Sequence, residues 1–377
     1  MWEKIARFVM KRPVIHVLLI GGLLIITMLP ITGMKISEPG AEILPTKYDS
    51  RQGYDIIVEA YDERSVSPIM VAIEMDKAYY EESSIDAMTA FTEDVKGIEN
   101  VSSVDSYISV AEDLGELDTK GMVALDEVRN VLEEEQLVSN QTAIVIVESA
   151  VYPLDEKTSN IIHEIRGLEH DGLTTYVFGE TAMNVDMIER IAKGVPFTIG
   201  FVFLMTFIIL LVAFQSVVLP LKAIAMNVLS LGASFGVVVM IVQHGYLADF
   251  FGIAHLGFLT AVTPVIIFCV VFGISMDYEV FMLSRIQEEY RQTKDNEHST
   301  AVGLMRTGNI ITSAAFILII VVGAFLLTDV EIIKALGLGL AIAVFLDATI
   351  VRLFLVPSFM KLMGDWNWWA PKWMVKK

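Results

Sequence analysis

Long hydrophobic stretches alternate with polar segments along the chain, and six of them are long enough to cross a membrane. A helix needs about 20 residues to span the roughly 30 Å hydrocarbon core of a bilayer. The stretches that reach this length are approximately 14–33, 195–214, 219–242, 257–283, 308–328 and 332–356. The pattern therefore predicts an α-helical membrane bundle of six spans. The first stretch could instead be a cleavable signal peptide, although no A-x-A-like cleavage site follows it.

The polar segment between the first two spans, residues 35–194, has a pattern of its own. Strands are expected at 66–75, 100–108, 142–150 and 173–179, and helices at 83–98, 123–137, 155–169 and 180–193. Apart from the helix at 123–137 and the last helix, the order is β-α-β-β-α-β, which is typical of the ferredoxin-like, or split βαβ, arrangement. The last helix runs directly into the second span, whereas residues 44–55 are expected to form a looser link to the first.

The distribution of charge indicates which side of the membrane this domain occupies. The net charge is -19, and residues 35–194 hold 34 of the 46 acids but only 12 of the 27 Lys and Arg residues. Most of the other bases precede the first span, lie in or beside the short connections, as Lys222 does, or follow the sixth span. By the positive-inside rule, both termini are cytoplasmic and residues 35–194 form an α+β extracytoplasmic domain.

Four parts of the chain follow from this topology. They are residues 1–34 with the cytoplasmic N-terminus and first span, 35–194 with the extracytoplasmic domain, 195–356 with spans two to six, and the cytoplasmic tail 357–377. The charged segment 285–306 is expected to be an amphipathic helix lying along the inner membrane surface.

The composition excludes several classes of protein. With 54% hydrophobic residues and a mean hydropathy of +0.58, the chain is too apolar for an ordinary soluble enzyme. A single cysteine, Cys269, offers no disulfide framework or Cys-based metal site, and the six histidines lack a ligand-like i, i+4 spacing. No phosphate-binding loop, basic patch for nucleic acid, or pairing of a nucleophile with a base is legible. We therefore expect no catalytic site, no metal and no bound cofactor.

The fourth span contains unusual polar residues in 273-GISMDYEVFMLSRI-286. An ionised carboxylate near the middle of a bilayer costs several kcal/mol, by estimates that start at about 3. Asp277 precedes Arg285 by eight residues, or about 12 Å along a helix, so it lies well below the inner surface. Such a carboxylate is either a group that gains and loses a proton near neutral pH or one that is hydrogen-bonded for packing alone.

The residues beside Asp277 suggest how it could be satisfied. Tyr278 is about 100° further round the helix and cannot easily bond its own neighbour. Two such helices packed about a two-fold axis could pair Asp277 of each with Tyr278 of the other. Glu279 continues the polar run on a third face.

The sixth span carries a second charged pair in FLDATIVRLFLVP, where Asp347 and Arg352 are five residues apart. Arg352 is expected to extend to the cytoplasmic surface, and Asp347 then needs a partner such as Thr312, Ser313, or Thr349 of a neighbouring copy. Both a structural role and a role in a proton path stay open for this pair.

Small residues recur at helix-contact spacing in 230-SLGASFG-236 and 337-GLGLAIA-343. Such runs favour close approach between membrane helices.

Taken together, these residues resemble the mycobacterial membrane protein large (MmpL) group of the resistance-nodulation-division transporters. The resemblance covers essentially the whole chain and rests on three motifs in order: LPTKYDSRQGYDIIVEAY (44–61), GISMDYEVFMLSRI (273–286) and LDATIVRLFLVPSFMKLMGDWNWWAP (346–371). Family members look like two tandem copies of this plan, with twelve spans and two porter domains driven by proton influx. The chain resembles the second copy, and the resemblance implies that Asp277 and Tyr278 belong to the proton relay.

The resemblance implies half of a proton-coupled exporter in a bacterial plasma membrane, with the proton gradient in place of a cofactor. The expected partners are membrane lipids, a hydrophobic or amphiphilic cargo, and a second transporter half, which is either the same chain or a first-half copy. Two alternatives stay open. One is an accessory unit resembling SecD/SecF that acts on a translocating polypeptide, and the other is a non-transporting sensor or scaffold of the sterol-sensing type, in which the carboxylate is merely structural.

Overall fold

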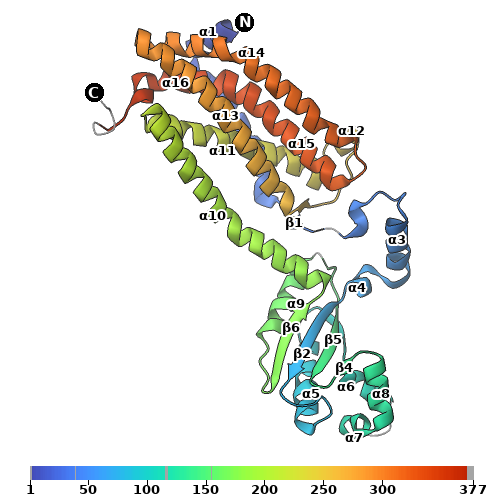
Figure 1. Ribbon diagram of the computed structural model, residues 1–377. Helices are drawn as coiled ribbons and strands as arrows, with labels where there is room; N and C mark the ends of the chain where they lie inside the picture. The colour runs from blue at the N-terminus through green and yellow to red at the C-terminus, as the bar shows by residue number, and fades with distance from the viewer. Residues whose placement is uncertain (1, 39, 115–117, 154, 372–377) are drawn as a thin grey trace. The chain divides into compact units, whose positions relative to one another are not determined.

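The computed structural model of the protein describes residues 2–38, 40–114, 118–153 and 155–371 (Figure 1). The chain divides into two compact units. The first unit comprises residues 1–37, 43–45 and 191–377, and the second comprises residues 38–42 and 46–190.

The first unit contains the membrane helices, and the prediction of six spans is confirmed. Six helices are long and apolar enough to cross a membrane: Pro13–Gly33, Glu180–Phe214, Val218–Gln243, Val262–Thr293, Asn296–Leu327 and Glu331–Trp368. Two spans are single α-helices, α10 (Glu180–Phe214) and α13 (Val262–Thr293). The other four combine an α-helix with 3-10 or π segments, which are labelled η. The first is α2 (Pro13–Met28) with η1 (Leu29–Gly33), the third is α11 (Val218–Val238) with η3 (Val239–Gln243), the fifth is α14 (Asn296–Gly323) with η4 (Ala324–Leu327), and the sixth is α15 (Glu331–Phe345) with η5 (Leu346–Leu355), α16 (Val356–Met363) and η6 (Gly364–Trp368). The helix expected at 180–193 is the first part of α10, which continues past Pro196.

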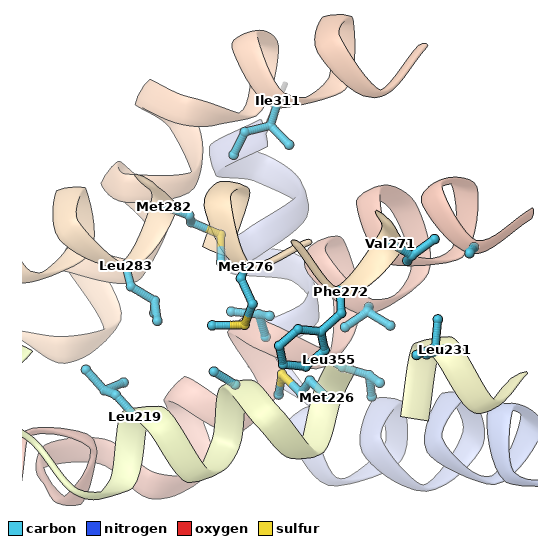
Figure 2. Packing of buried hydrophobic residues seen from close by; sticks show 14 of the residues in the cluster. Leu219, Met226, Leu231, Val271, Phe272, Met276, Met282, Leu283, Ile311 and Leu355 are labelled. Carbon is cyan, nitrogen blue, oxygen red and sulfur yellow. The ribbon is translucent and has the colours of Figure 1, made fainter. Parts of the chain in front are cut away.

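The core of the bundle is built from aliphatic, methionine and phenylalanine side chains. Figure 2 shows Phe272 and Met276 of α13 gathered with Met226 of α11 and Leu355 of η5. Methionine suits such a place because its flexible thioether fills irregular gaps between helices.

The glycine-rich run in α11 brings that helix into direct contact with α2. A Cβ added at Gly236 would lie 1.7 Å from the carbonyl oxygen of Thr27, and one at Gly232 would lie 2.7 Å from the sulfur of Met28. The predicted close approach at this run is therefore present, and its reason is steric: no larger residue leaves room for the backbone of α2.

The motif at 346–371 ends in a group of hydrogen-bonded and stacked side chains around η6, which we call the 364–369 cluster. The Asn296 and Asn367 side-chain amides donate to the Met360 carbonyl oxygen at 2.6 Å and 2.9 Å. The Trp368 indole donates to the Asn296 side-chain oxygen at 3.1 Å, and its ring stacks on Tyr290 with centroids 4.5 Å apart. These contacts tie η6 to the facing ends of α13 and α14.

The charged segment 285–306 does not form a separate surface helix, so that expectation is wrong. The helix α13 continues to Thr293, Lys294 takes a left-handed conformation with φ 56°, and α14 begins at Asn296. The carboxylate of Asp295 accepts hydrogen bonds from the first backbone N–H groups of α14, which fixes the start of that helix.

The remaining elements of the first unit are short. They are α1 (Trp2–Lys11), α12 (Ala248–Phe251), and the parallel pair β1 (Ile36–Ser37) and β7 (Leu259–Thr260).

The second unit is built on an antiparallel sheet. Its strands are β2 (Ile69–Met75), β3 (Val101–Asp105), β4 (Val138–Ser139), β5 (Thr142–Ser149) and β6 (Leu173–Phe178). The order is β3-β5-β2-β6, with β4 paired to β5 and every pairing antiparallel. The helices α5 (Glu82–Lys96) and α9 (Glu156–Gly167) follow β2 and β5 along the chain. The strands β2, β5 and β6 and the two helices lie close to their expected bounds, and alternating burial along β2 and β5 matches the alternating sequence.

Three segments of the second unit differ from expectation. Residues after Asp105 turn into α6 (Tyr107–Leu114) instead of continuing the strand, and the single helix expected at 123–137 is two helices, α7 (Thr119–Ala124) and α8 (Asp126–Glu134). The link at 44–55 is largely helical, since α3 (Asp49–Tyr61) and α4 (Glu63–Val66) occupy it and the residues after it. Side-chain caps explain two of these starts: Asp118 accepts from the Gly121 N–H and Asp62 from the Arg64 N–H.

Candidate functional site

Three consecutive polar residues of α13 face three different surroundings. Successive residues are about 100° apart around a helix, so Asp277, Tyr278 and Glu279 cannot share one face. Asp277 is exposed and has no hydrogen-bond or ion-pair partner among the residues that the structure describes. Tyr278 is half-buried, and Glu279 is buried with 4% of its surface exposed. The bundle of this chain therefore buries Glu279, not Asp277.

Asp277 lies on an exposed stripe of α13 that is otherwise apolar, which we call the open stripe. Its members recur every three or four residues, as one side of a helix requires. They are Val262, Ile266, Cys269, Val270, Gly273 and Asp277. A Cβ added at Gly273 would meet nothing within 4 Å, so the backbone itself is bare one turn from the carboxylate.

On the buried side of α13, four charged side chains come together, which we call the inner charge cluster. Glu279, Lys222, Asp347 and Arg352 are each no more than 7% exposed. Glu279 interacts electrostatically with the other three, yet its Oε1 has no hydrogen-bond partner in the structure. Two anions and two cations balance, which is what makes burying them tolerable. Within the described residues, no group of three or more His, Cys, Asp or Glu is arranged to hold a metal ion.

Asp347 and Arg352 form the one direct ion pair of this cluster. The Arg352 Nη2 donates to the Asp347 carboxylate at 2.8 Å, and each side chain is 6% exposed. The expectation that Arg352 extends to the surface is therefore wrong, and within the chain the partner of Asp347 is Arg352 and not Thr312 or Ser313.

The reason for this pairing is the helix type of η5. In an α-helix, residues five apart point about 140° away from each other, since each residue turns by about 100°. Residues Leu346–Leu355 instead form a π-helix. Its i→i+5 hydrogen bonds turn less per residue and bring Asp347 and Arg352 to one side.

Arg352 also connects this pair to Tyr278. Its guanidinium carbon lies 5.3 Å from the centroid of the Tyr278 ring, within cation–π range. Thr312 lines a small cavity beside Arg352, whereas Ser313 is exposed. The structure thus brings together Tyr278, Arg352 and Asp347, and leaves Ser313 apart.

Lys222 is the residue of this site that the sequence analysis missed. We assigned it to a cytoplasmic connection, but it lies in the first turns of α11 and its Nζ is 2.8 Å from the Met360 sulfur. A thioether is a weak acceptor. The available signal was its position, four residues inside the predicted third span, where a lysine needs a counter-charge.

Comparison with known proteins places the chain in a family. Residues 42–377 match the sequence profile of the MMPL family. The chain belongs to the MMPL family. MMPL relatives include the membrane protein YdfJ of Bacillus subtilis, 30% identical over 98% of this chain and 47% of YdfJ. The trehalose monomycolate exporter MmpL3 of Mycobacterium tuberculosis is 30% identical over 99% of this chain and 37% of its own length.

A further MMPL relative is the mycolic acid-containing lipids exporter MmpL11 of Mycolicibacterium smegmatis, 36% identical over 63% of this chain and 25% of that protein. The chain therefore spans about half, or less, of the length of the curated relatives that it matches. Family membership and six apolar helices together make it a multi-pass membrane protein. Two of these MMPL relatives are named as lipid exporters.

Proposed function

We propose that the chain is one half of a proton-coupled exporter of lipid-like or amphiphilic molecules in a bacterial plasma membrane. The observation that carries the proposal is the position of Asp277: a carboxylate on the apolar open stripe, next to a tyrosine that contacts the buried Arg352–Asp347 pair. The relatives named as lipid exporters support the choice of cargo.

The open stripe requires a second transporter half. An uncovered carboxylate facing hydrocarbon carries a penalty of at least about 3 kcal/mol, whereas a facing helix with a hydroxyl donor removes it. Gly273 leaves room for that helix to approach one turn away from Asp277. We propose that this half is a first-half copy or a second copy of this chain. In either case Asp277 of one helix would pair with a tyrosine of the other.

Protonation of Asp277 would remove its charge from this seam and change how the two central helices pack. Tyr278 is the next residue on α13 and touches Arg352, so a shift of α13 would move against the Arg352–Asp347 pair on η5. This gives the proton-driven step a mechanical connection from the seam to the interior of the bundle. Glu279, with an unpaired buried oxygen, is the second carboxylate that we assign to this relay.

We propose that the second unit is a ferredoxin-like porter domain that handles the cargo. The support is the β-α-β-β-α-β succession of β2, α5, β3, β5, α9 and β6, and the sheet order β3-β5-β2-β6. In that order the first and third strands lie at the centre, as the split βαβ arrangement requires.

The function is tested by proton flux and cargo export in liposomes that contain the chain with its partner half. Asp277→Asn keeps the size of the side chain and removes its titration, so export should stop while expression and insertion stay normal. Glu288→Gln, on the exposed cytoplasmic part of the same helix, is the matched control and should export normally. Full export by Asp277→Asn would refute the relay, and absence of proton flux from the wild type would favour the sensor or scaffold.

The proposed topology has both termini in the cytoplasm and residues 35–194 outside. Ser83 and Arg291 are both exposed, so a cysteine at either position is reachable from its own side. In a Cys269-free protein on intact cells, an impermeant thiol reagent should label position 83 and not 291. The reverse labelling would overturn the topology.

A further inference from the structure

A small cavity lies under the N-terminal helix α1, next to the inner charge cluster. Its volume is about 10 Å³, and its lining includes Trp2 of α1, Thr307, Gly308 and Thr312 of α14, and Arg352 of η5. A cavity of this kind can hold one water if it has about 10–15 Å³ and two to four polar partners.

The polar groups at the cavity are incompletely satisfied. Arg352 uses Nη2 for Asp347, but its Nη1 is buried and has no hydrogen-bond partner in the structure. Thr307 donates to the Gly303 carbonyl at 2.9 Å, which leaves its oxygen free to accept. Thr312 adds a second hydroxyl. An unsatisfied buried guanidinium N–H in a cavity that two threonines also line favours a buried water.

Trp2 forms the wall of this cavity on the side of α1. Its side chain is buried, and its indole N–H donates to the Asn309 side-chain oxygen at 2.7 Å. The ring packs on Gly308 so closely that an added Cβ would come within 2.6 Å of it. The Trp2 ring is thus held by its hydrogen bond to Asn309 and by close packing against Gly308.

The rest of α1 is suited to a surface position. Ala6, Val9 and Met10 are buried against the bundle, whereas Lys4 and Arg7 are exposed. With ten residues, α1 is too short to cross a membrane. A movement of this helix away from α14 would withdraw Trp2 and connect the cavity with the surface on which α1 lies.

We propose that this cavity binds a water that bridges Arg352 Nη1 to the threonine hydroxyls, and that Trp2 is a latch that controls water access to the Arg352–Asp347 pair. The water site and the latch stand on the contacts above. If the proposed function holds, this water is also where protons would leave the inner charge cluster, and that part alone rests on the proposed function.

The latch is tested by the reactivity of a buried cysteine. Thr307, 1% exposed, is replaced by Cys in the Cys269→Ala protein, and its reaction with a small thiosulfonate is timed in the purified protein. Trp2→Ala should speed the reaction at least about tenfold, which corresponds to about 1.4 kcal/mol. Gly308→Ala should also speed the reaction, because its methyl group displaces the Trp2 indole. Trp2→Phe keeps an aromatic ring at this position but loses the hydrogen bond to Asn309, so its effect should be smaller.

The control is a cysteine at Ser234, which is fully buried on α11 and should stay unreactive in every variant. If Trp2→Ala makes position 234 reactive as well as position 307, that substitution has loosened the whole bundle. The reaction rate at position 307 in Trp2→Phe then decides whether Trp2 controls access to the cavity. Equal rates at position 307 in wild type, Trp2→Ala and Gly308→Ala would overturn the latch.

The water is tested separately by solid-state NMR of arginine-labelled protein in lipid. A water contact to the Arg352 guanidinium, identified by its loss in Arg352→Lys, is expected, and its absence would overturn the water site. Trp2→Ala should also leak protons in liposomes. Faster reaction at position 307 with no proton flux in any variant would keep the latch and refute the proposed function instead.

Discussion

Breaking the Asp347–Arg352 pair should show how the inner charge cluster is balanced. Arg352→Met leaves Asp347 buried without its counter-ion, and Asp347→Asn leaves Arg352 in the same condition. Removing one partner of a buried pair costs about 3–5 kcal/mol, so each single variant should lose about that much stability. Arg352→Met also loses the contact with Tyr278, worth about 0.5–2 kcal/mol, and should be the worse of the two.

The double variant Asp347→Asn with Arg352→Met restores the balance of charge. Glu279 and Lys222 then face each other without a surplus anion or cation, as in the wild type. The double variant should therefore lose only about 1–2 kcal/mol, much less than the sum of the single losses. Arg352→Lys, which keeps the charge but not the planar group over Tyr278, is the matched control.

The measurement is reversible unfolding of the purified protein by SDS titration in mixed micelles, with the free energy compared among the four proteins. Coupled residues deviate from additivity by about 0.5–3 kcal/mol or more, whereas independent ones add within about 0.5 kcal/mol. Additive losses for the single and double variants would refute the reasoning, because they would mean that neither charge depends on the other.

Further predictions follow from single features of the structure. Gly236→Ala should lower the free energy of unfolding by about 3 kcal/mol or more and cut the yield of folded protein, because the new methyl group would overlap the Thr27 carbonyl. A Cβ at Gly22 on the facing helix would meet nothing within 4 Å, so Gly22→Ala should be neutral in the same unfolding assay. If two copies of the chain pair through the open stripe, mild oxidation should join them through a disulfide between the two Cys269 side chains. The absence of a disulfide-linked dimer in the wild type would contradict that arrangement, and Cys269→Ala is the control without a thiol. Burial raises the pKa of Tyr79 to about 12, and its hydrogen bond to Glu133 adds to the shift. The stability that comes from the neutral phenol of Tyr79 is complete below about pH 10 and is lost as the pH rises towards 12. Tyr79→Phe should therefore shift alkaline unfolding to higher pH, as measured by near-UV circular dichroism. Tyr152 is exposed, so Tyr152→Phe should not shift it.

The sequence predicts the six spans and the sheet well because both depend on local patterns. A run of 20 apolar residues has few alternatives to a membrane helix, and alternation in β2 and β5 assigns one face of each strand to the core. Helix starts and turns depend on single capping residues, which is why the three helices after β3 and the continuous helix at 285–293 differ from expectation.

Apart from Lys222, the members of the site were predicted, but their geometry was not. Asp277, Tyr278, Glu279, Asp347 and Arg352 were recognised because charges in apolar spans stand out. Which of them are buried depends on how the helices rotate against each other, and periodicity does not give that rotation. No residue type marks the π-helix that joins Asp347 to Arg352, so its position could not be predicted from the sequence, and Arg352 was expected at the surface.

The π-helix also sets the phase of everything that follows it in the chain. With one residue fewer between Asp347 and Arg352, an ordinary α-helix would still place the two charges one turn apart. The extra residue is therefore not needed for the ion pair. Because a π-helix turns less per residue than an α-helix, the orientation of α16 and of the 364–369 cluster depends on the helix type of η5. Met360 on α16 contacts both Asn296 and Lys222, so the helix type of η5, and not only its composition, determines how the 364–369 cluster meets the inner charge cluster.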